Sequence, residues 1–242
     1  MRTVAGELES ALSRLFAQPI KVTVAGRTDA GVHAVGQVVS FVAHDHFPVA
    51  KLSIALNTSL PADLTARDAA RVENGFSARL AAVERRYRYA VLNRRDPSAV
   101  LRRFAHHEHR ALDLGAMHEA AAHLVGEHDF VTFCGVIPDR GGTVRSVGAI
   151  DVDRDGEIVR IAVRGAGFLH HMVRIIVGTL LDVGAGKRSP QDVAAMLAAR
   201  DRRCGGPTAP PQGLVLAGVR YPNFDSEPPS FSWPPIADWS SR

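Results

Sequence analysis

The chain has 242 residues, of which 46% are hydrophobic, 22% charged and 6% aromatic, and its net charge is +4 at pH 7. These proportions and this length are those of a soluble globular protein with one large or two small domains. Most of the basic residues are arginines, which is compatible with a nucleic-acid partner. The two cysteines lack metal-ligand spacing and no apolar run has membrane-spanning length, so we expect a cytoplasmic protein without disulfides, zinc-thiolate site or membrane segment.

The first third of the chain predicts a helix on each side of a pair of strands. The expected elements are a helix at 4–17 with Thr3 as a candidate N-cap, strands at 21–24 and 37–43, a helix at 48–56 and a weak strand at 64–72. Between the two strands, Gly26 and Gly31 bracket Arg27, Thr28 and Asp29. Glycine allows positive φ and close approach of another chain, so we expect a rigid loop that presents Arg27 and Asp29 outward. The same residues also fit an ordinary turn.

The rest of the chain predicts strands that alternate with helices. The expected elements are strands at 83–93, 144–152, 157–163 and 214–221, a helix capped by Asp113, and helices that begin at Phe168 and at Ser189-Pro190, with a loop at 94–112. The helix at 168–183 is expected to end at Gly184 in the left-handed conformation. Residues 222–242 are rich in Pro, Ser and Asp, which is typical of a mobile tail.

The two halves of the chain follow a similar order of elements. The second half has the split βαβ order of a ferredoxin-like fold, and the first half has the same order without its first strand. We therefore predict an α+β protein with an N-terminal ferredoxin-like half at 1–80, a similar C-terminal half at 81–222 and a flexible tail at 223–242.

Three stretches of the chain resemble, in the same order, motifs of the tRNA pseudouridine synthase A family. They are Gly26-Arg-Thr-Asp-Ala-Gly-Val-His33, Arg85-Arg-Tyr-Arg-Tyr89 and Phe168-Leu-His-His-Met-Val-Arg174 with Ile176-Val-Gly178. The resemblance runs from about Thr3 to Tyr221. It implies the pseudouridine synthase fold, in which both halves form a continuous antiparallel sheet with helices on one face. Family members begin with a further strand, so we expect that the start codon of this chain was assigned too late.

The resemblance also implies an activity and a partner. The family converts uridine to pseudouridine at positions 38, 39 and 40 in the anticodon stem-loop of tRNA, as a homodimer and without metal or cofactor. The reaction breaks the C1′–N1 bond, rotates the base and rejoins it through C5. It needs an ionised carboxylate at the sugar, either as nucleophile at C1′ or as base at C2′, and a base turned out of its stack.

The matched motifs assign roles to five residues. Asp29 is the expected catalytic carboxylate, and Arg27 on the same loop is expected to reach the RNA. Arg174 is expected to pair with Asp29, because a charged residue among apolar neighbours needs a partner. The alternative is an arginine that extends from the helix edge to solvent. Tyr87 is expected to stack on the uracil and could relay the proton that leaves C5. His170 is expected to line the RNA cleft.

Two further interpretations concern the histidines and Tyr89. On a helix, the adjacent His170 and His171 would point about 100° apart, which excludes an i,i+4 metal pair, and we expect no metal site. Alternation places Tyr87 and Tyr89 on the same face of their strand, so only the motif separates an active-site tyrosine from a core aromatic.

Two other functions remain open at this point. A truncated, catalytically impaired paralogue would fold and bind tRNA without chemistry. A different aspartate-dependent enzyme, such as a small hydrolase, would need a second catalytic carboxylate or a set of metal ligands, and the sequence offers neither at a convincing spacing.

Overall fold

The computed structural model describes residues 2–44 and 47–235, which divide into two compact units. The first unit lies within residues 1–27 and 38–82, and the second within 28–37 and 83–242. The last of these boundaries along the chain falls between residues 82 and 83, and the predicted halves meet between 80 and 81. The segment at 28–37 differs from that prediction, because it belongs to the second unit and not to the N-terminal half.

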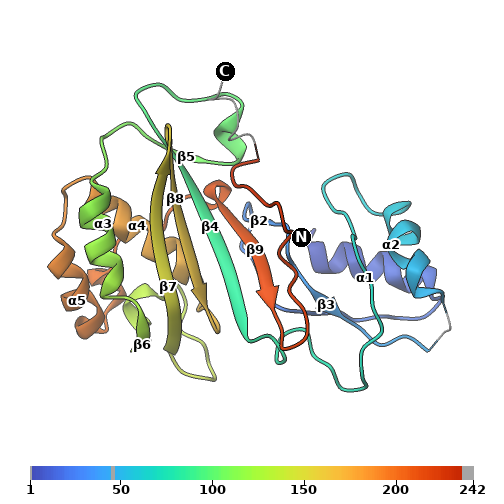
Figure 1. Ribbon diagram of the computed structural model, residues 1–242. Helices are drawn as coiled ribbons and strands as arrows, with labels where there is room; N and C mark the ends of the chain where they lie inside the picture. The colour runs from blue at the N-terminus through green and yellow to red at the C-terminus, as the bar shows by residue number, and fades with distance from the viewer. Residues whose placement is uncertain (1, 45–46, 236–242) are drawn as a thin grey trace. The chain divides into compact units, whose positions relative to one another are not determined.

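The first unit consists of two helices and two short strands (Figure 1). They are α1 (Val4–Leu15), β1 (Thr23–Val24), β3 (Val39–Ser40) and α2 (Val49–Asn57). The Thr3 side chain caps α1 by accepting a hydrogen bond from the Gly6 amide at 3.1 Å. The prediction of a strand at 64–72 is wrong, because this segment forms no regular structure. Its residues from 67 onward are exposed, so the apolar residues there do not mark a buried strand face.

The core of the first unit lies between its two helices. A buried cluster joins the two helices and the segment that follows α1. It consists of Leu8, Ala11 and Leu12 from α1, Ile20 from that segment, and Leu52 and Leu56 from α2. The helical spacing of these residues explains why both helices could be predicted from the sequence.

The second unit is built on a seven-stranded sheet (Figure 1). Its strands are β2 (His33–Ala34), β4 (Glu84–Asn93), β5 (His106–Glu108), β6 (Gly126–Asp129), β7 (Val144–Asp155), β8 (Ile158–Gly165) and β9 (Leu214–Arg220). The order is β2-β9-β4-β8-β7-β6, and β5 pairs with the end of β4. In this register Tyr87 lies between Val163 of β8 and Leu216 of β9.

The α+β class is confirmed, but the continuous antiparallel sheet is not. The described strands form two sheets, and in the larger one β2 runs parallel to β9 and β5 runs parallel to β4. Strands β2, β5 and β6 were not predicted, and β5 lies inside the predicted loop at 94–112. They have two to four residues each, too few for alternation to be recognised.

Three helices pack on one face of the large sheet: α3 (Leu114–Ala122), α4 (Met172–Gly184) and α5 (Pro190–Ala199). Asp113 and Ser189 cap α3 and α5 as predicted. The predicted start of α4 is wrong, since the helix begins at Met172 after His171 in the left-handed conformation. Gly184 is helical and packs against Met117, and the positive φ after the helix is at Gly186. None of the described helices is long and apolar enough to span a membrane.

The C-terminal segment as far as residue 235 is packed against the other face of the large sheet, which corrects the predicted flexible tail. After β9 the chain turns back along the sheet (Figure 1). Trp233 is only 4% exposed and packs with Ala90, Leu92 and Val215. The sequence did not predict this docking, because Pro and Ser hide the few aromatic anchors in the segment. Trp239 lies outside the described residues.

Candidate active site

The loop Thr28–Gln37, here called the catalytic loop, is held by backbone contacts within the second unit. A turn closes at its start, where the Val32 amide donates to the Asp29 carbonyl at 3.1 Å. At its end, the amides of Val35 and Gly36 donate to the Leu216 carbonyl at 3.0 and 3.3 Å. Gly31 has φ +83°, so the predicted need for glycine at this turn is confirmed.

Asp29 pairs with Arg174, as the sequence predicted. An Arg174 Nη1 atom donates to Asp29 Oδ2 at 2.8 Å, although the two residues are 145 positions apart. The Arg174 side chain is 12% exposed and the Asp29 side chain 23% exposed. Arg174 Nε donates at 2.7 Å to the Ala209 carbonyl, so the guanidinium is fixed by two acceptors in a fork geometry. The carboxylate is thus oriented while it stays reachable from solvent.

His171 is the second neighbour of the Asp29 carboxylate, and the sequence did not predict it. Its Nε2 lies 3.4 Å from Asp29 Oδ2. Because His171 precedes α4 with φ 59°, its ring stacks on that of His170, with centroids 3.6 Å apart. The interpretation of two helical side chains pointing 100° apart is therefore wrong. His170 itself is exposed beside the site.

A glycine makes room for the two stacked histidine rings. A methyl group at Gly135 would lie 2.8 Å from His170 Nδ1 and 2.9 Å from His171 Nδ1. The Gly135 amide also donates to the His170 carbonyl at 2.9 Å. Burial lowers the pKa of His171, and the nearby Asp29 carboxylate only partly opposes this. The imidazole is therefore neutral at pH 7, which leaves Arg174 as the cationic partner of Asp29.

Tyr87 is buried on β4 in the same unit, with 8% of its surface exposed. Its ring meets the edge of Phe168 at a centroid distance of 5.4 Å and an angle of 87°. Burial raises the pKa of Tyr87 to about 12; the Arg85 guanidinium opposes the shift and the Asp29 carboxylate adds to it. The phenol is therefore neutral at physiological pH, and Asp29 is near enough to influence it.

Tyr89 has a different environment from Tyr87, which separates the two tyrosines that the sequence pattern left together. Tyr89 is fully buried, and its hydroxyl donates to the Pro210 carbonyl at 2.9 Å. This is the contact of a core residue. Of the two, only Tyr87 has its pKa influenced by the Asp29 carboxylate.

Arg27 is the one predicted site residue outside the second unit. It is exposed and is the last residue of the first unit before the chain enters the catalytic loop. The structure therefore groups Asp29, Arg174, Tyr87 and His170 in one unit, with Arg27 two residues before Asp29 in the sequence.

Three of these residues could offer atoms to a metal ion. One ligand atom each of Asp29, His170 and His171 lies within 4.8 Å of the others. The Arg174 cation, however, already contacts the Oδ2 atom of that carboxylate at 2.8 Å and would repel a second cation there. This arrangement suits an oriented carboxylate better than a divalent cation.

Comparisons with known proteins agree on one family. A family model described as tRNA pseudouridine synthase matches residues 1–79 and 120–222. The match leaves out 80–119, which contains Tyr87, so the position of Tyr87 is supported by its motif and its surroundings.

Curated relatives resemble the chain over most of its length, and each of the following is named tRNA pseudouridine synthase A. The protein of Halalkalibacterium halodurans is 46% identical over 215 residues, which are 88% of this chain and 82% of the relative. That of Moorella thermoacetica is 45% identical, covering 90% of this chain and 89% of the relative. That of Bacillus subtilis is 42% identical, covering 92% and 91%.

Proposed function

The chain belongs to the tRNA pseudouridine synthase family, and we propose that it converts uridine to pseudouridine at positions 38, 39 and 40 in the anticodon stem-loop of tRNA. It is an isomerase, because the product has the same atoms as the substrate. The observation that carries the proposal is the Asp29–Arg174 pair, which places an oriented carboxylate beside Tyr87 in the second unit.

In this proposal Asp29 acts on the ribose of the target uridine. An ionised carboxylate either attacks C1′ or removes the proton at C2′, and in both routes the C1′–N1 bond breaks. The base then turns and a C1′–C5 bond forms, as the Asp29 oxygen leaves C1′ in the first route or returns its proton to C2′ in the second. C5 then loses its proton and N1 gains one. Arg174 holds the carboxylate in place as the reaction begins, so that little reorganisation is needed when the bond breaks.

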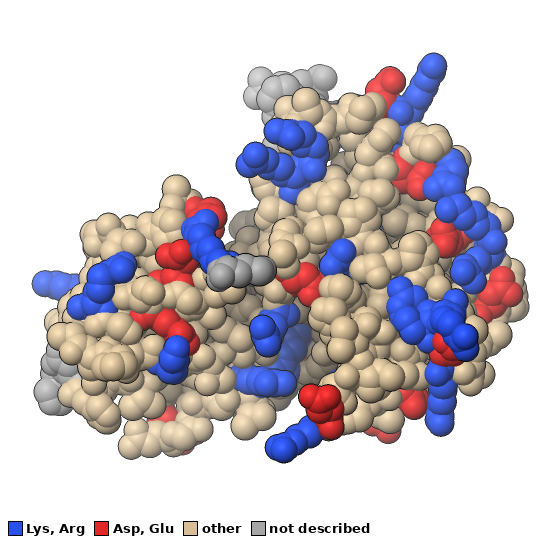
Figure 2. All heavy atoms as spheres, turned by 180° about the vertical axis from the view of Figure 1, so that it is seen from behind, with Lys and Arg blue, Asp and Glu red and all other residues tan. Residues whose placement is uncertain are grey.

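The other site residues bind the nucleotide and the RNA around it. Tyr87 stacks on the uracil after the base has left its helix, and its neutral phenol can relay the proton that leaves C5 by passing its own hydroxyl proton on as it takes up that one. Arg27 and His170 are exposed and bind the RNA. Groups of Lys and Arg side chains also occur on the second unit (Figure 2), and such groups attract the phosphate backbone.

The impaired tRNA-binding paralogue is the less favoured function. A paralogue that only binds RNA would have no use for a carboxylate that is oriented by an arginine, itself fixed by a second hydrogen bond to a backbone carbonyl. Asp29, Arg174 and Tyr87 are all present, and the first two are within hydrogen-bond distance.

Two further features belong to the proposal. The cell compartment is the cytoplasm, which is supported by the free thiols of Cys134 and Cys204. The chain acts as a homodimer, as its resemblance to the family implies. Sedimentation at micromolar concentration should give the mass of two chains, and the mass of one chain would contradict the dimer.

The function is tested by mapping the product in a tRNA transcript that has uridines at positions 38, 39 and 40 and at other sites. After incubation with the chain, pseudouridine is expected at these three positions and nowhere else. A matched transcript with cytidine at the three positions should give none. Product only at other positions would contradict the assignment of the anticodon stem-loop.

A further inference from the structure

The residues Phe224–Trp233, here called the strap, contact the catalytic loop although they lie outside the known family match. The matched residues end at 222. The strap returns along the sheet from the end of β9 (Figure 1). Two of its side chains, Ser226 and Trp233, contact the half of the catalytic loop that follows Asp29.

Ser226 holds the end of the catalytic loop. Its hydroxyl donates to the Gly36 carbonyl at 2.7 Å and accepts from the Val219 amide of β9 at 2.8 Å. Because the Gly36 amide donates to Leu216, also in β9, both polar groups of Gly36 are tied to one strand. A methyl group at Gly36 would lie 2.3 Å from the Ala217 carbonyl oxygen, which shows how close the two backbones are.

Trp233 packs on the middle of the catalytic loop. Its ring lies 5.1 Å from that of His33 and 5.8 Å from that of Phe104, and the His33 and Phe104 rings are 5.3 Å apart. The indole Nε1 donates to the Gly213 carbonyl at 2.8 Å. Gly213 and Pro211 belong to one short helical turn, Pro211–Gly213, and the Pro211 ring lies against Gly31, two residues after Asp29. Trp233 therefore supports the loop directly and also through the segment that contacts its tight turn.

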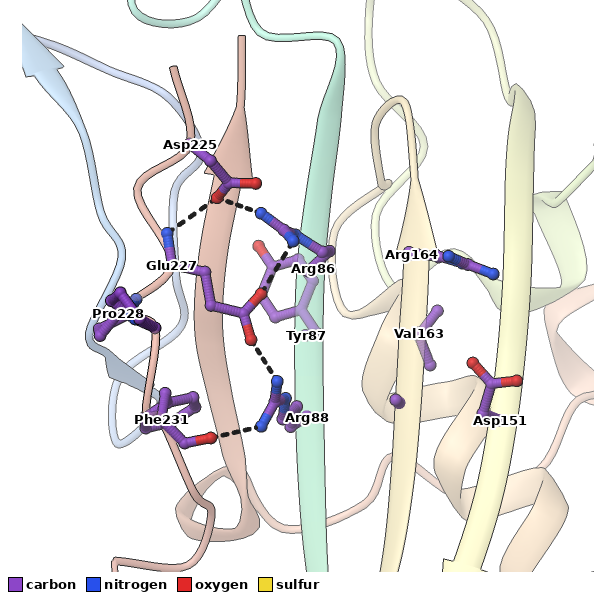
Figure 3. Close-up of a pocket in the computed structure, with 12 residues that line it drawn as sticks. Arg86, Tyr87, Arg88, Asp151, Val163, Arg164, Asp225, Glu227, Pro228 and Phe231 are labelled. Carbon is purple, nitrogen blue, oxygen red and sulfur yellow. Dashed lines mark hydrogen bonds and ion pairs between the residues drawn. The ribbon is translucent and has the colours of Figure 1, made fainter.

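Ion pairs anchor the strap to β4, as Figure 3 shows. Arg86 pairs with Asp225 and Glu227, and Arg88 pairs with Glu227. Arg88 Nη1 also donates to the Phe231 carbonyl at 2.8 Å, while its guanidinium lies 5.1 Å from the centre of the Phe231 ring. A pocket of about 410 Å³ lies beside this anchor. The strap is therefore fixed to the strand that carries Tyr87.

We propose that the strap holds the catalytic loop in its working conformation, with Ser226 and Trp233 as positioning residues for Asp29. The inference rests on the proposed function. The loop's regular structure is limited to the two residues of β2, and its other backbone hydrogen bonds lie near its two ends, so the side-chain contacts of the strap restrict its conformational freedom further. A carboxylate that moves by about 1 Å can lose on the order of a hundredfold in rate.

The kinetic test compares variants of the full chain under single-turnover conditions with unmodified tRNA. Trp233→Ala should lower the rate of pseudouridine formation about tenfold or more, with tRNA affinity within about twofold of the parent. Trp233→Phe keeps a ring against His33 and should recover most of the rate. Ser226→Ala should lower the rate, whereas Ser230→Ala, an exposed serine of the strap, should not. Equal rates per folded molecule in Trp233→Ala, Ser226→Ala and the parent would overturn the proposal.

A second measurement tests the strap without relying on activity. Hydrogen exchange of the peptide spanning 28–37 reports the amides of Val32, Val35 and Gly36, each of which donates a hydrogen bond. Exchange there should be faster in Trp233→Ala than in the parent, with β7 and β8 unchanged. Unchanged exchange in the catalytic loop would overturn the proposal even if the enzyme were active. Pseudouridine formation by the parent tests the proposed function separately.

Discussion

Replacing Arg174 tests how the candidate site is built. In Arg174→Met the side chain keeps much of its length but loses the hydrogen bonds to Asp29 Oδ2, at 2.8 Å, and to the Ala209 carbonyl, at 2.7 Å. In Arg174→Lys the charge remains, but one ammonium replaces the planar fork that serves both acceptors. Both variants should bind tRNA and form pseudouridine more slowly than the parent.

The size of the effect follows from the hydrogen bond to the carboxylate. A hydrogen bond to a charged group contributes roughly 1.5–3 kcal/mol, and its loss in the transition state corresponds to about 10- to 150-fold in rate. Because the Arg174 side chain is only 12% exposed, solvent offers limited compensation. Arg174→Met should be at the upper end of this range and Arg174→Lys at the lower end.

The assay is single-turnover pseudouridine formation at saturating enzyme, with tRNA affinity and thermal unfolding measured beside it. Arg94→Met is a matched control, because Arg94 pairs with Glu157 at the far end of β4 and is 36% exposed. It removes the same charge from the second unit and should leave the rate unchanged. If folded Arg174→Met keeps a rate within about threefold of the parent, the reasoning about the pair is refuted.

Three other predictions concern stability. Burial raises the pKa of Tyr87 and Tyr221 to about 12, from an ordinary 10.0. Their contribution to the stability of the fold is therefore complete below pH 10 and is lost as pH rises through 12. The Tm should fall in that window, and less steeply in Tyr221→Phe. The hydrogen bond from Arg110 lowers the pKa of Glu108 to about 2 from 4.5, so denaturant unfolding should show Glu108→Gln less stable than the parent by about 1–3 kcal/mol at pH 7, a difference that shrinks as pH falls from 4.5 through 2. Equal stability at pH 7 would contradict the role of that pair. A methyl group in Gly178→Ala would lie 1.9 Å from the Pro207 carbonyl oxygen, so this variant should lose about 1–3 kcal/mol or fail to fold, whereas Gly167→Ala, with no neighbour within 4 Å, should melt like the parent.

Local patterns predicted most of the helices and the long strands. Thr3, Asp113 and Ser189 marked helix starts because each caps its helix with its own side chain. The alternation in β4 was visible because one face carries arginines and the other carries tyrosines. Strands of two to four residues, such as β2 and β5, were missed because backbone pairing with distant strands creates them, and no local pattern records that pairing.

The sequence predicted the central pair of the candidate site but not the residues that surround it. Motifs and the apolar surroundings of Arg174 indicated its pair with Asp29, which the structure confirms. The position of His171 beside Asp29 depends on a left-handed residue before α4, and the support from Trp233 depends on a docked segment 200 positions along the chain from His33. Both are consequences of tertiary packing, and neither is encoded in the spacing of nearby residues.

The central claim is that Asp29 carries the isomerisation of uridine. Its most direct test is the amount of pseudouridine formed in unmodified tRNA by the parent and by Asp29→Asn, which keeps the shape of the side chain and removes its charge. Both proteins should melt cooperatively and bind tRNA. We predict product with the parent and none above background with Asp29→Asn. Product from the folded variant at a rate close to that of the parent would contradict the account.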